Sequence, residues 1–410
     1  MDMKNMLKKY ATLAVKKGVN LQKDQVLLVN SPIECVDFSR AIAEVAYKEG
    51  AKEVVVHYSD QSLQKLKLEY ASMDTLKETP NWIAESYNSY AKQGCAVISI
   101  SASDPDAYKN IPMDKIAAFQ KSRQLALKEY YDYSMSNKIR WTVVSVPTEA
   151  WALKVFKNSN SEEAVSKLWD VIFNVVRLNS DDPIEAWNEH NNNISKNLNF
   201  LNSNKLKKLH YKNSIGTDLT IELPEDHIWL GGSEKCAAGI EFNANMPTEE
   251  VYTLPKKTGI NGTVVSSKPL SYGGNLIDDF SLTFKDGKVI DFTAKEGFET
   301  LKKLLDSDDG AKYLGEVALV PYDSPISNSN LIFYNTLFDE NAACHLAFGK
   351  AYPTCIINGE NLSNEELSKK GANDSIIHVD FMIGTKDLDI TGYTEDTTEI
   401  KIFTSGNWAF

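Results

Sequence analysis

The sequence predicts an α/β N-terminal domain with a mainly parallel sheet, followed by an α+β C-terminal metal-binding domain with a mainly antiparallel sheet. Strand-like and helix-like segments alternate through the first half of the chain, as in α/β folds. Short strands and turns replace that alternation in the second half. The histidines and acids that could bind a metal ion also lie in the second half. We therefore expect one domain over residues 1–195 and a catalytic, metal-binding domain over 196–410.

The strands expected in the first half are short runs of consecutive apolar residues. Such runs are typical of parallel strands whose two faces are both buried. Helical periodicity lies between them, predicting helices over residues 36–49, 113–135 and 161–178, and an amphipathic helix over the first twenty residues. The apolar runs are Gln25–Val29, Glu53–His57, Cys95–Ile100 and Trp141–Val146.

The first strand is not followed by a glycine-rich loop. Residues Asn30–Cys35 contain no glycine, so a GxGxxG dinucleotide site and a nucleotide-dependent dehydrogenase have little support. His57 ends the second predicted strand and is placed to line a cleft. A structural or solvated histidine is the alternative interpretation there.

The pattern changes from alternating strands and helices to short strands and turns near residues 185–205. This stretch is rich in asparagine and suits the end of a helix as well as a linker. Strands are predicted after it, over residues 207–211, 216–223, 262–266 and 281–291. The last of these contains Asp286-Gly287, a signal for a hairpin turn.

Composition excludes several classes of function. Of the 410 residues, 42% are hydrophobic and 24% charged, as in ordinary globular proteins, and the net charge of -12 disfavours nucleic acid and anionic membranes as partners. No run of 18 apolar residues predicts a membrane span, and the N-terminus lacks the apolar core of a signal peptide. The five scattered cysteines indicate reduced thiols and a cytoplasmic location.

His378 and Asp380 form the most informative pair. In Ser375–Ile383, apolar residues alternate with His378, Asp380 and Met382, so on a strand the two polar side chains share one face. A histidine and a carboxylate placed in this way suit one zinc, manganese or cobalt ion. A buried histidine that hydrogen-bonds its neighbour remains the alternative.

Four other segments of the second half carry candidate site residues. Glu250 lies between prolines that restrict the backbone, and Glu316 lies in an apolar strand, where it must be exposed, paired or metal-bound. Residues 339–349 resemble a helix start, in which Glu340 and His345 reach one site only if Glu340 precedes the first turn. Tyr352 stands before a proline.

Each of these residues taken singly also has an ordinary structural interpretation, as a surface acid, a helix cap or a packed core residue. Together, three glutamates, two histidines and an aspartate supply the ligands that two adjacent divalent cations need.

Three segments carry a resemblance to a known family: Asn245–Pro255, Asp339–Pro353 and Ile376–Gly384. In this order and spacing they resemble the M29 metallopeptidases, the group of aminopeptidase T and aminopeptidase S (PepS). The resemblance extends over essentially the whole chain, including Gly216–Leu219, Trp229–Gly232 and Ser405–Trp408.

The resemblance implies a cytoplasmic aminopeptidase that uses two divalent metal ions per subunit (zinc, cobalt or manganese) on peptides with a free N-terminus. It also implies a homodimer that encloses the active sites. The family's metal-ligand positions fall on Glu250, Glu316, His345, His378 and Asp380. Glu340 matches a ligand or catalytic carboxylate, Glu316 is an alternative general base, and Tyr352 matches a tyrosine beside the metals.

Cys344 departs slightly from the pattern, because a smaller residue would also fit beside His345. It is either a soft-metal ligand or a small buried side chain. Two rival functions stay open: another dinuclear hydrolase of amides, such as a dipeptidase, or a non-catalytic binding protein with structural acids and histidines.

Overall fold

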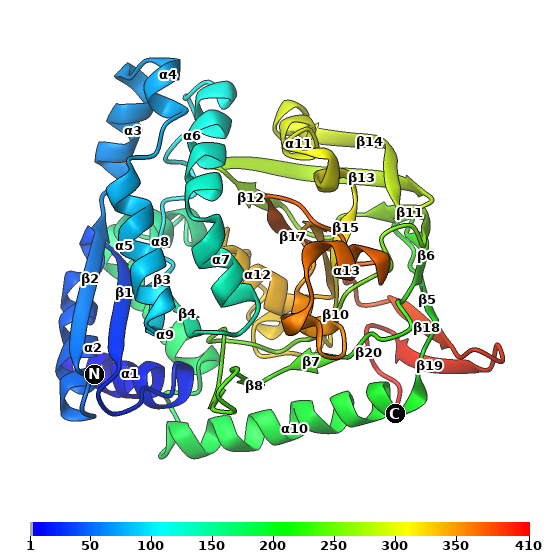
Figure 1. Ribbon diagram of the computed structural model, residues 1–410, viewed down its shortest axis with the longest axis horizontal. Helices are drawn as coiled ribbons and strands as arrows, with labels where there is room; N and C mark the ends of the chain where they lie inside the picture. The colour runs from blue at the N-terminus through cyan, green and yellow to red at the C-terminus, as the bar shows by residue number, and fades with distance from the viewer. Residues whose placement is uncertain (1–2) are drawn as a thin grey trace. The chain divides into compact units, whose positions relative to one another are not determined.

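The computed structural model describes residues 3–410, which divide into two compact units (Figure 1). Unit 1 contains residues 3–192, 233–248 and 333–337, and unit 2 contains residues 193–232, 249–332 and 338–410. The expected N-terminal helix is present from Met3 on, its first two residues lying outside the described part of the chain. Within residues 3–410, no helix is long and apolar enough to cross a membrane.

Unit 1 is built on a parallel sheet of the order β2-β1-β3-β4, as the sequence predicts. Val26, Leu28 and Val97 on one face pack against α5 and α7. The strands are β1 (Val26–Pro32), β2 (Glu53–Ser59), β3 (Ala96–Ile100) and β4 (Arg140–Val144), with the short β8 (Glu234–Lys235) and β9 (Glu241–Phe242) apart from them. The helices are α1 (Met3–Leu13), η1 (Ala14–Gly18), η2 (Ile33–Cys35), α2 (Val36–Lys48), α3 (Gln61–Tyr70), α4 (Met73–Leu76), α5 (Asn81–Lys92), α6 (Met113–Ala126), α7 (Lys128–Met135), α8 (Glu149–Val155), α9 (Ser161–Val175) and the start of α10 (Pro183–Asn204).

One detail differs from the sequence-based expectation: the helix predicted over residues 113–135 is interrupted at Leu127, which caps α6 and precedes α7. The asparagine-rich stretch forms the end of α10, so the interpretation as the end of a helix is confirmed.

Unit 2 contains two antiparallel sheets that share one hydrophobic core. The five-stranded sheet has the order β17-β16-β15-β10-β7, and the nine-stranded sheet runs from β12 to β20. Apolar side chains of both sheets meet in that core, among them Leu209, Ile221, Leu346 and Phe381. One face of the five-stranded sheet is therefore committed to packing.

The strands of unit 2 are β5 (Lys208–Lys212), β6 (Asp218–Glu222), β7 (Leu230–Gly231), β10 (Val251–Thr253), β11 (Ile260–Val265), β12 (Leu270–Tyr272), β13 (Asn275–Lys285), β14 (Lys288–Glu296), β15 (Leu314–Leu319), β16 (His345–Gly349), β17 (His378–Met382), β18 (Asp389–Tyr393), β19 (Glu399–Thr404) and β20 (Asn407–Trp408). The remaining helices are α11 (Phe298–Leu305), η3 (Asp309–Lys312), η4 (Ser327–Ser329), α12 (Thr336–Asp339), η5 (Glu340–Ala342), η6 (Pro353–Cys355), η7 (Gly359–Asn361) and α13 (Asn364–Lys369).

The hairpin predicted at Asp286-Gly287 is confirmed. Lys285 pairs with Lys288 across the turn, and both central residues have positive φ, 50° and 84°, as a type I′ turn requires. A Cβ added at Gly287 would overlap the backbone oxygen of Lys257.

Replacing Gly287 with alanine should lower the free energy of unfolding by about 2 kcal/mol or more, because strain at positive φ adds to the overlap with Lys257. Gly239→Ala is the matched control, since Gly239 also has positive φ but no atom within 4 Å of an added Cβ. Chemical denaturation measures both, and equal losses would contradict the prediction.

Candidate metal centre

The candidate site lies on the face of the five-stranded sheet opposite the core. Along β15, β16 and β17, Val317, Leu346 and Phe381 point into the core, so the alternate residues point the other way. Those alternate residues include Glu316, His345, His378 and Asp380, and Glu250 directly precedes β10.

Small residues make room for the polar side chains. In the strand register Ala347 stands between Glu316 of β15 and Asp380 of β17, and Gly349 stands opposite His378. Ala318 is the neighbour of His345. Without a bulky side chain at these three positions, the longer acids and imidazoles can lean over the sheet and converge.

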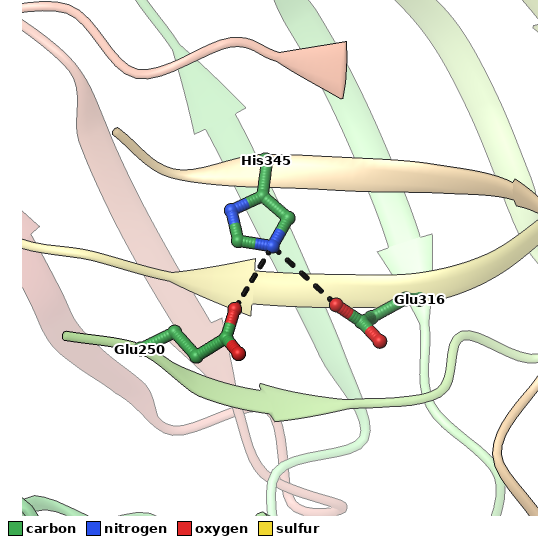
Figure 2. Close-up of side chains that lie close together, drawn as sticks. All are labelled: Glu250, Glu316 and His345. Carbon is green, nitrogen blue, oxygen red and sulfur yellow. Dashed lines mark ion pairs between the residues drawn. The ribbon is translucent and has the colours of Figure 1, made fainter. Parts of the chain in front are cut away.

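One group of converging side chains is formed by Glu250, Glu316 and His345 (Figure 2). Nε2 of His345 lies 3.0 Å from Oε2 of Glu250 and 3.4 Å from Oε1 of Glu316. All three side chains are almost fully buried. One nitrogen and two carboxylate oxygens are a ligand set suited to zinc or manganese.

A second group is formed by Glu316, His378 and Asp380. Nε2 of His378 lies 3.6 Å from Oε2 of Glu316 and 3.3 Å from Oδ1 of Asp380. Glu316 thus belongs to both groups and turns one oxygen toward each histidine. Such a carboxylate is placed to bridge two adjacent cations.

Backbone carbonyls orient both imidazoles. Nδ1 of His345 lies 3.1 Å from the carbonyl oxygen of Ala343, and Nδ1 of His378 lies 2.7 Å from that of Lys350. A carbonyl only accepts, so Nδ1 carries the hydrogen in each ring and Nε2 faces the carboxylates. This is how metal-binding histidines are commonly held.

The titration behaviour reflects burial and crowding of charges. Burial raises the pKa of Glu316 to about 7, although both histidines oppose that shift. Burial also favours a neutral His378, but Asp380 and Glu316 outweigh it and raise the pKa of His378 to about 9. At His345, Glu250 and Glu316 likewise overcome burial, so its pKa is well above the ordinary value. Without cations, the centre therefore retains protons near neutral pH.

The residues present fit bound cations. Oδ1 of Asp380 is buried and accepts no hydrogen bond from the described residues, although it lies close to His378. Burial raises the pKa of Glu340 well above its usual range, and the nearby acids Asp380 and Glu250 raise it further. Burial and the neighbouring acids thus keep Glu340 protonated, and Glu316 partly protonated, near neutral pH when no cation is bound. Bound cations would compensate the charge of these buried carboxylates and let them ionise.

Glu340 and Tyr352 lie at the edge of the two groups and belong to neither. Glu340 is buried, and Nδ2 of Asn341 lies 3.4 Å from its Oε1. Oδ1 of the same Asn341 accepts a 2.7 Å hydrogen bond from the amide of Glu249, next to Glu250. The ring of Tyr352 meets that of His378 edge to face at 5.0 Å.

The prediction that a helix starts within residues 339–349 is wrong. Glu340–Ala342 form a single 3₁₀ turn, and His345 opens strand β16. Small residues suggested a helix, but pairing with β15 and β17 on both sides imposes the extended conformation. Glu340 does precede the segment that carries His345.

Cys344 behaves as a small core residue. It packs in the core cluster, its thiol lies 3.3 Å from the carbonyl oxygen of Val320, and burial raises its pKa to about 12. A protonated thiol in the core is a poor ligand.

Comparisons with known proteins identify the family. The chain matches the family described as thermophilic metalloprotease (M29) over residues 3–408. It is 52% identical to aminopeptidase 2 of Geobacillus stearothermophilus and 50% identical to aminopeptidase AmpS of Bacillus subtilis, with 98% of each chain covered. Wild-type AmpT from Thermus thermophilus superposes with a TM-score of 0.91 at 40% identity, covering 100% of both chains.

Fold, ligand geometry and these matches together define a metal-dependent peptidase. The chain belongs to the M29 metalloprotease family across nearly its whole length.

Enlarging Ala347 should disturb the centre selectively. Ala347→Leu places a branched side chain between Glu316 and Asp380, and overpacking of this kind costs about 1–3 kcal/mol. We expect bound metal, measured by atomic emission, to fall at least severalfold. Val317→Leu overpacks the opposite face and serves as the control. Equal metal contents in the two variants would contradict the role given to Ala347.

Metal affinity should rise with pH from about 6 to about 9, since cations must displace protons from Glu316 (pKa about 7) and His378 (pKa about 9). Both values lie above the ordinary 4.5 and 6.5. The two protons therefore stabilise the metal-free fold at low pH, and this contribution disappears as the pH rises through 7 and then 9.

Calorimetry in buffers of different ionisation enthalpy counts the protons released on metal binding. Thermal unfolding of chelator-treated protein at several pH values measures how the stability of the metal-free fold falls as the pH rises. A metal affinity that stays constant over this pH range, with no proton release, would refute the assignment of Glu316 and His378 as metal ligands.

Proposed function

We propose that the protein is an aminopeptidase that releases N-terminal residues from peptides with the help of two divalent cations per subunit. The observation that carries the proposal is the shared carboxylate of Glu316, which turns one oxygen to His345 and the other to His378. Aminopeptidases among the relatives, at 50% identity and above, support the substrate class.

Five residues would hold the cations: Glu250, Glu316, His345, His378 and Asp380. The mixed nitrogen and oxygen donors accept zinc, cobalt or manganese. Two adjacent cations, when bound, lower the pKa of a water molecule toward neutrality and polarise the scissile carbonyl.

The protein's own side chains supply the remaining functions. Glu340 lies close enough to Asp380 and Glu250 for these acids, in addition to burial, to raise its pKa, and it would accept the proton of the attacking water and deliver it to the leaving amine. Glu316 is the alternative base. The ring of Tyr352 packs against His378, and its hydroxyl would donate a hydrogen bond to the developing oxyanion. The cluster of buried acids would favour a free, positively charged substrate N-terminus.

Two rival functions make different predictions. A dipeptidase would cleave dipeptides and spare longer peptides. A non-catalytic binding protein would be isolated without metal and would be indifferent to chelator. The convergence of acids and histidines in two groups, and a buried Asp380 oxygen that accepts no hydrogen bond, favour the catalytic proposal.

We further propose a cytoplasmic homodimer. All five cysteines are free and buried, which suits a reducing compartment. Light scattering of the purified protein tests the dimer.

Purified protein should hydrolyse leucyl and arginyl p-nitroanilides. Activity should disappear with chelator and return with zinc, cobalt or manganese, and N-acetylated substrates should not be cleaved. A panel of dipeptides and longer peptides distinguishes an aminopeptidase from a dipeptidase, which would cleave only the dipeptides. Turnover that survives exhaustive chelation would contradict the proposal.

Single substitutions separate ligands from the proposed base. His378→Ala and Asp380→Ala should each abolish turnover and reduce bound metal while the fold remains intact. Glu340→Gln should retain metal but lower kcat by roughly 10²–10⁴-fold. The control is Glu249→Gln, an acid outside both ligand groups. Retained turnover in both His378→Ala and Asp380→Ala would refute the ligand assignment.

A further inference from the structure

A row of polar side chains crosses the parallel sheet of unit 1. His57 of β2 is in register with Asn30 of β1, which is in register with Ser99 of β3. Two residues earlier on each strand, the same face carries Val55, Leu28 and Val97, which pack in an apolar cluster. The sheet face therefore changes from apolar to polar toward the carboxyl ends of three adjacent strands.

Hydrogen bonds fix the geometry of this row. Nδ2 of Asn30 donates to Oγ of Ser99 at 3.1 Å, and the Tyr87 hydroxyl of α5 donates to Oδ1 of Asn30 at 2.8 Å. Nε2 of His57 lies 3.3 Å from Oγ of Ser86, also on α5. His57, Asn30 and Ser99 are only half-buried, so solvent can reach them.

Arg123 of α6 adds a positive charge that no acid neutralises. Its guanidinium lies over the Tyr87 ring, 6.0 Å from the centroid, and close enough to His57 to lower the pKa of that imidazole, in addition to the effect of burial. Among the described residues, no carboxylate lies within ion-pair distance of Arg123.

The other arginines are engaged differently. Arg40 pairs with Asp37, whereas Arg140 and Arg177 hydrogen-bond to backbone carbonyls. A guanidinium has five N–H donors, and that of Arg123 interacts with a tyrosine. Most of its donors therefore remain for a ligand.

The row of polar side chains lies at the point of the sheet where the strand order reverses. The chain leaves β1 toward β2 on one side, while β3 lies on the other side, so the strand order reverses between β1 and β3. In open α/β sheets, ligands bind outside the carboxyl ends of the strands at this switch point. The hydrogen bond between Asn30 and Ser99 joins the two strands that flank it.

We propose that Arg123, His57, Ser99 and Asn30 form a second ligand site, separate from the metal centre, for a small molecule that carries a carboxylate or phosphate group. Arg123 supplies charge-assisted hydrogen bonds, and the hydroxyls of Ser86 and Ser99 can rotate to donate. The Tyr87 ring under the Arg123 guanidinium helps to fix its position. The proposal does not depend on the peptidase activity.

Titration calorimetry at constant ionic strength tests the site with inorganic phosphate and with acetate as probes. We expect one of the two to bind with a dissociation constant near or below roughly 10 mM. Phosphate binding alone would indicate a phosphoester ligand, and acetate binding alone a carboxylate. Arg123→Gln should weaken binding by roughly tenfold or more, because the charge is lost while the tyrosine contact can persist.

Three further variants complete the test. Arg40→Gln removes an arginine that pairs with Asp37 and should leave binding unchanged. Asn30→Asp keeps the shape of the row but adds a negative charge, so it should abolish binding. Asp380→Asn alters the metal centre, which can itself attract anions, and binding at the second site should survive it. No binding of either probe to the wild type, or equal binding by Arg123→Gln, would overturn the proposal.

Discussion

The candidate site depends on one buried carboxylate that has an imidazole at each of its two oxygens. Glu316 lies in the middle of an antiparallel sheet, where an isolated charge would be strongly disfavoured. His345 lies on one neighbouring strand and His378 on the next strand but one, so the register of three strands sets the distances at the centre. A register shift of one residue in any of these strands would turn the site residues of that strand into the core.

The same alternation explains why the sheet can be both stable and functional. Its core-facing residues, such as Leu346 and Phe348, belong to a large cluster shared with the second sheet of unit 2. The opposite face carries short residues next to long polar ones, so the polar side chains approach each other without distorting the backbone. Rigid packing on one face thus holds the candidate site on the other face in place.

The sequence allowed parts of this arrangement to be predicted and left others hidden. Alternation around His378 and Asp380 placed both on one strand face, and Asp286-Gly287 identified its hairpin, because these signals are local. The extended conformation at His345 was missed, since pairing with two distant strands decides it. The spacing role of Ala347 and the row of His57, Asn30 and Ser99 were also missed. Both depend on strand register, which no single segment encodes.

The candidate ligand positions are widely spread along the chain, from Glu250, just before β10, to Asp380 on β17. Contacts of such long sequence separation form late, because loop-closure entropy opposes them until neighbouring strands are in place. During synthesis, a chain that ends before β17 lacks both His378 and Asp380 and cannot complete the second ligand group. The two candidate ligand groups therefore cannot both form before the strands β10, β15 and β16 have been synthesised and β17 has joined them.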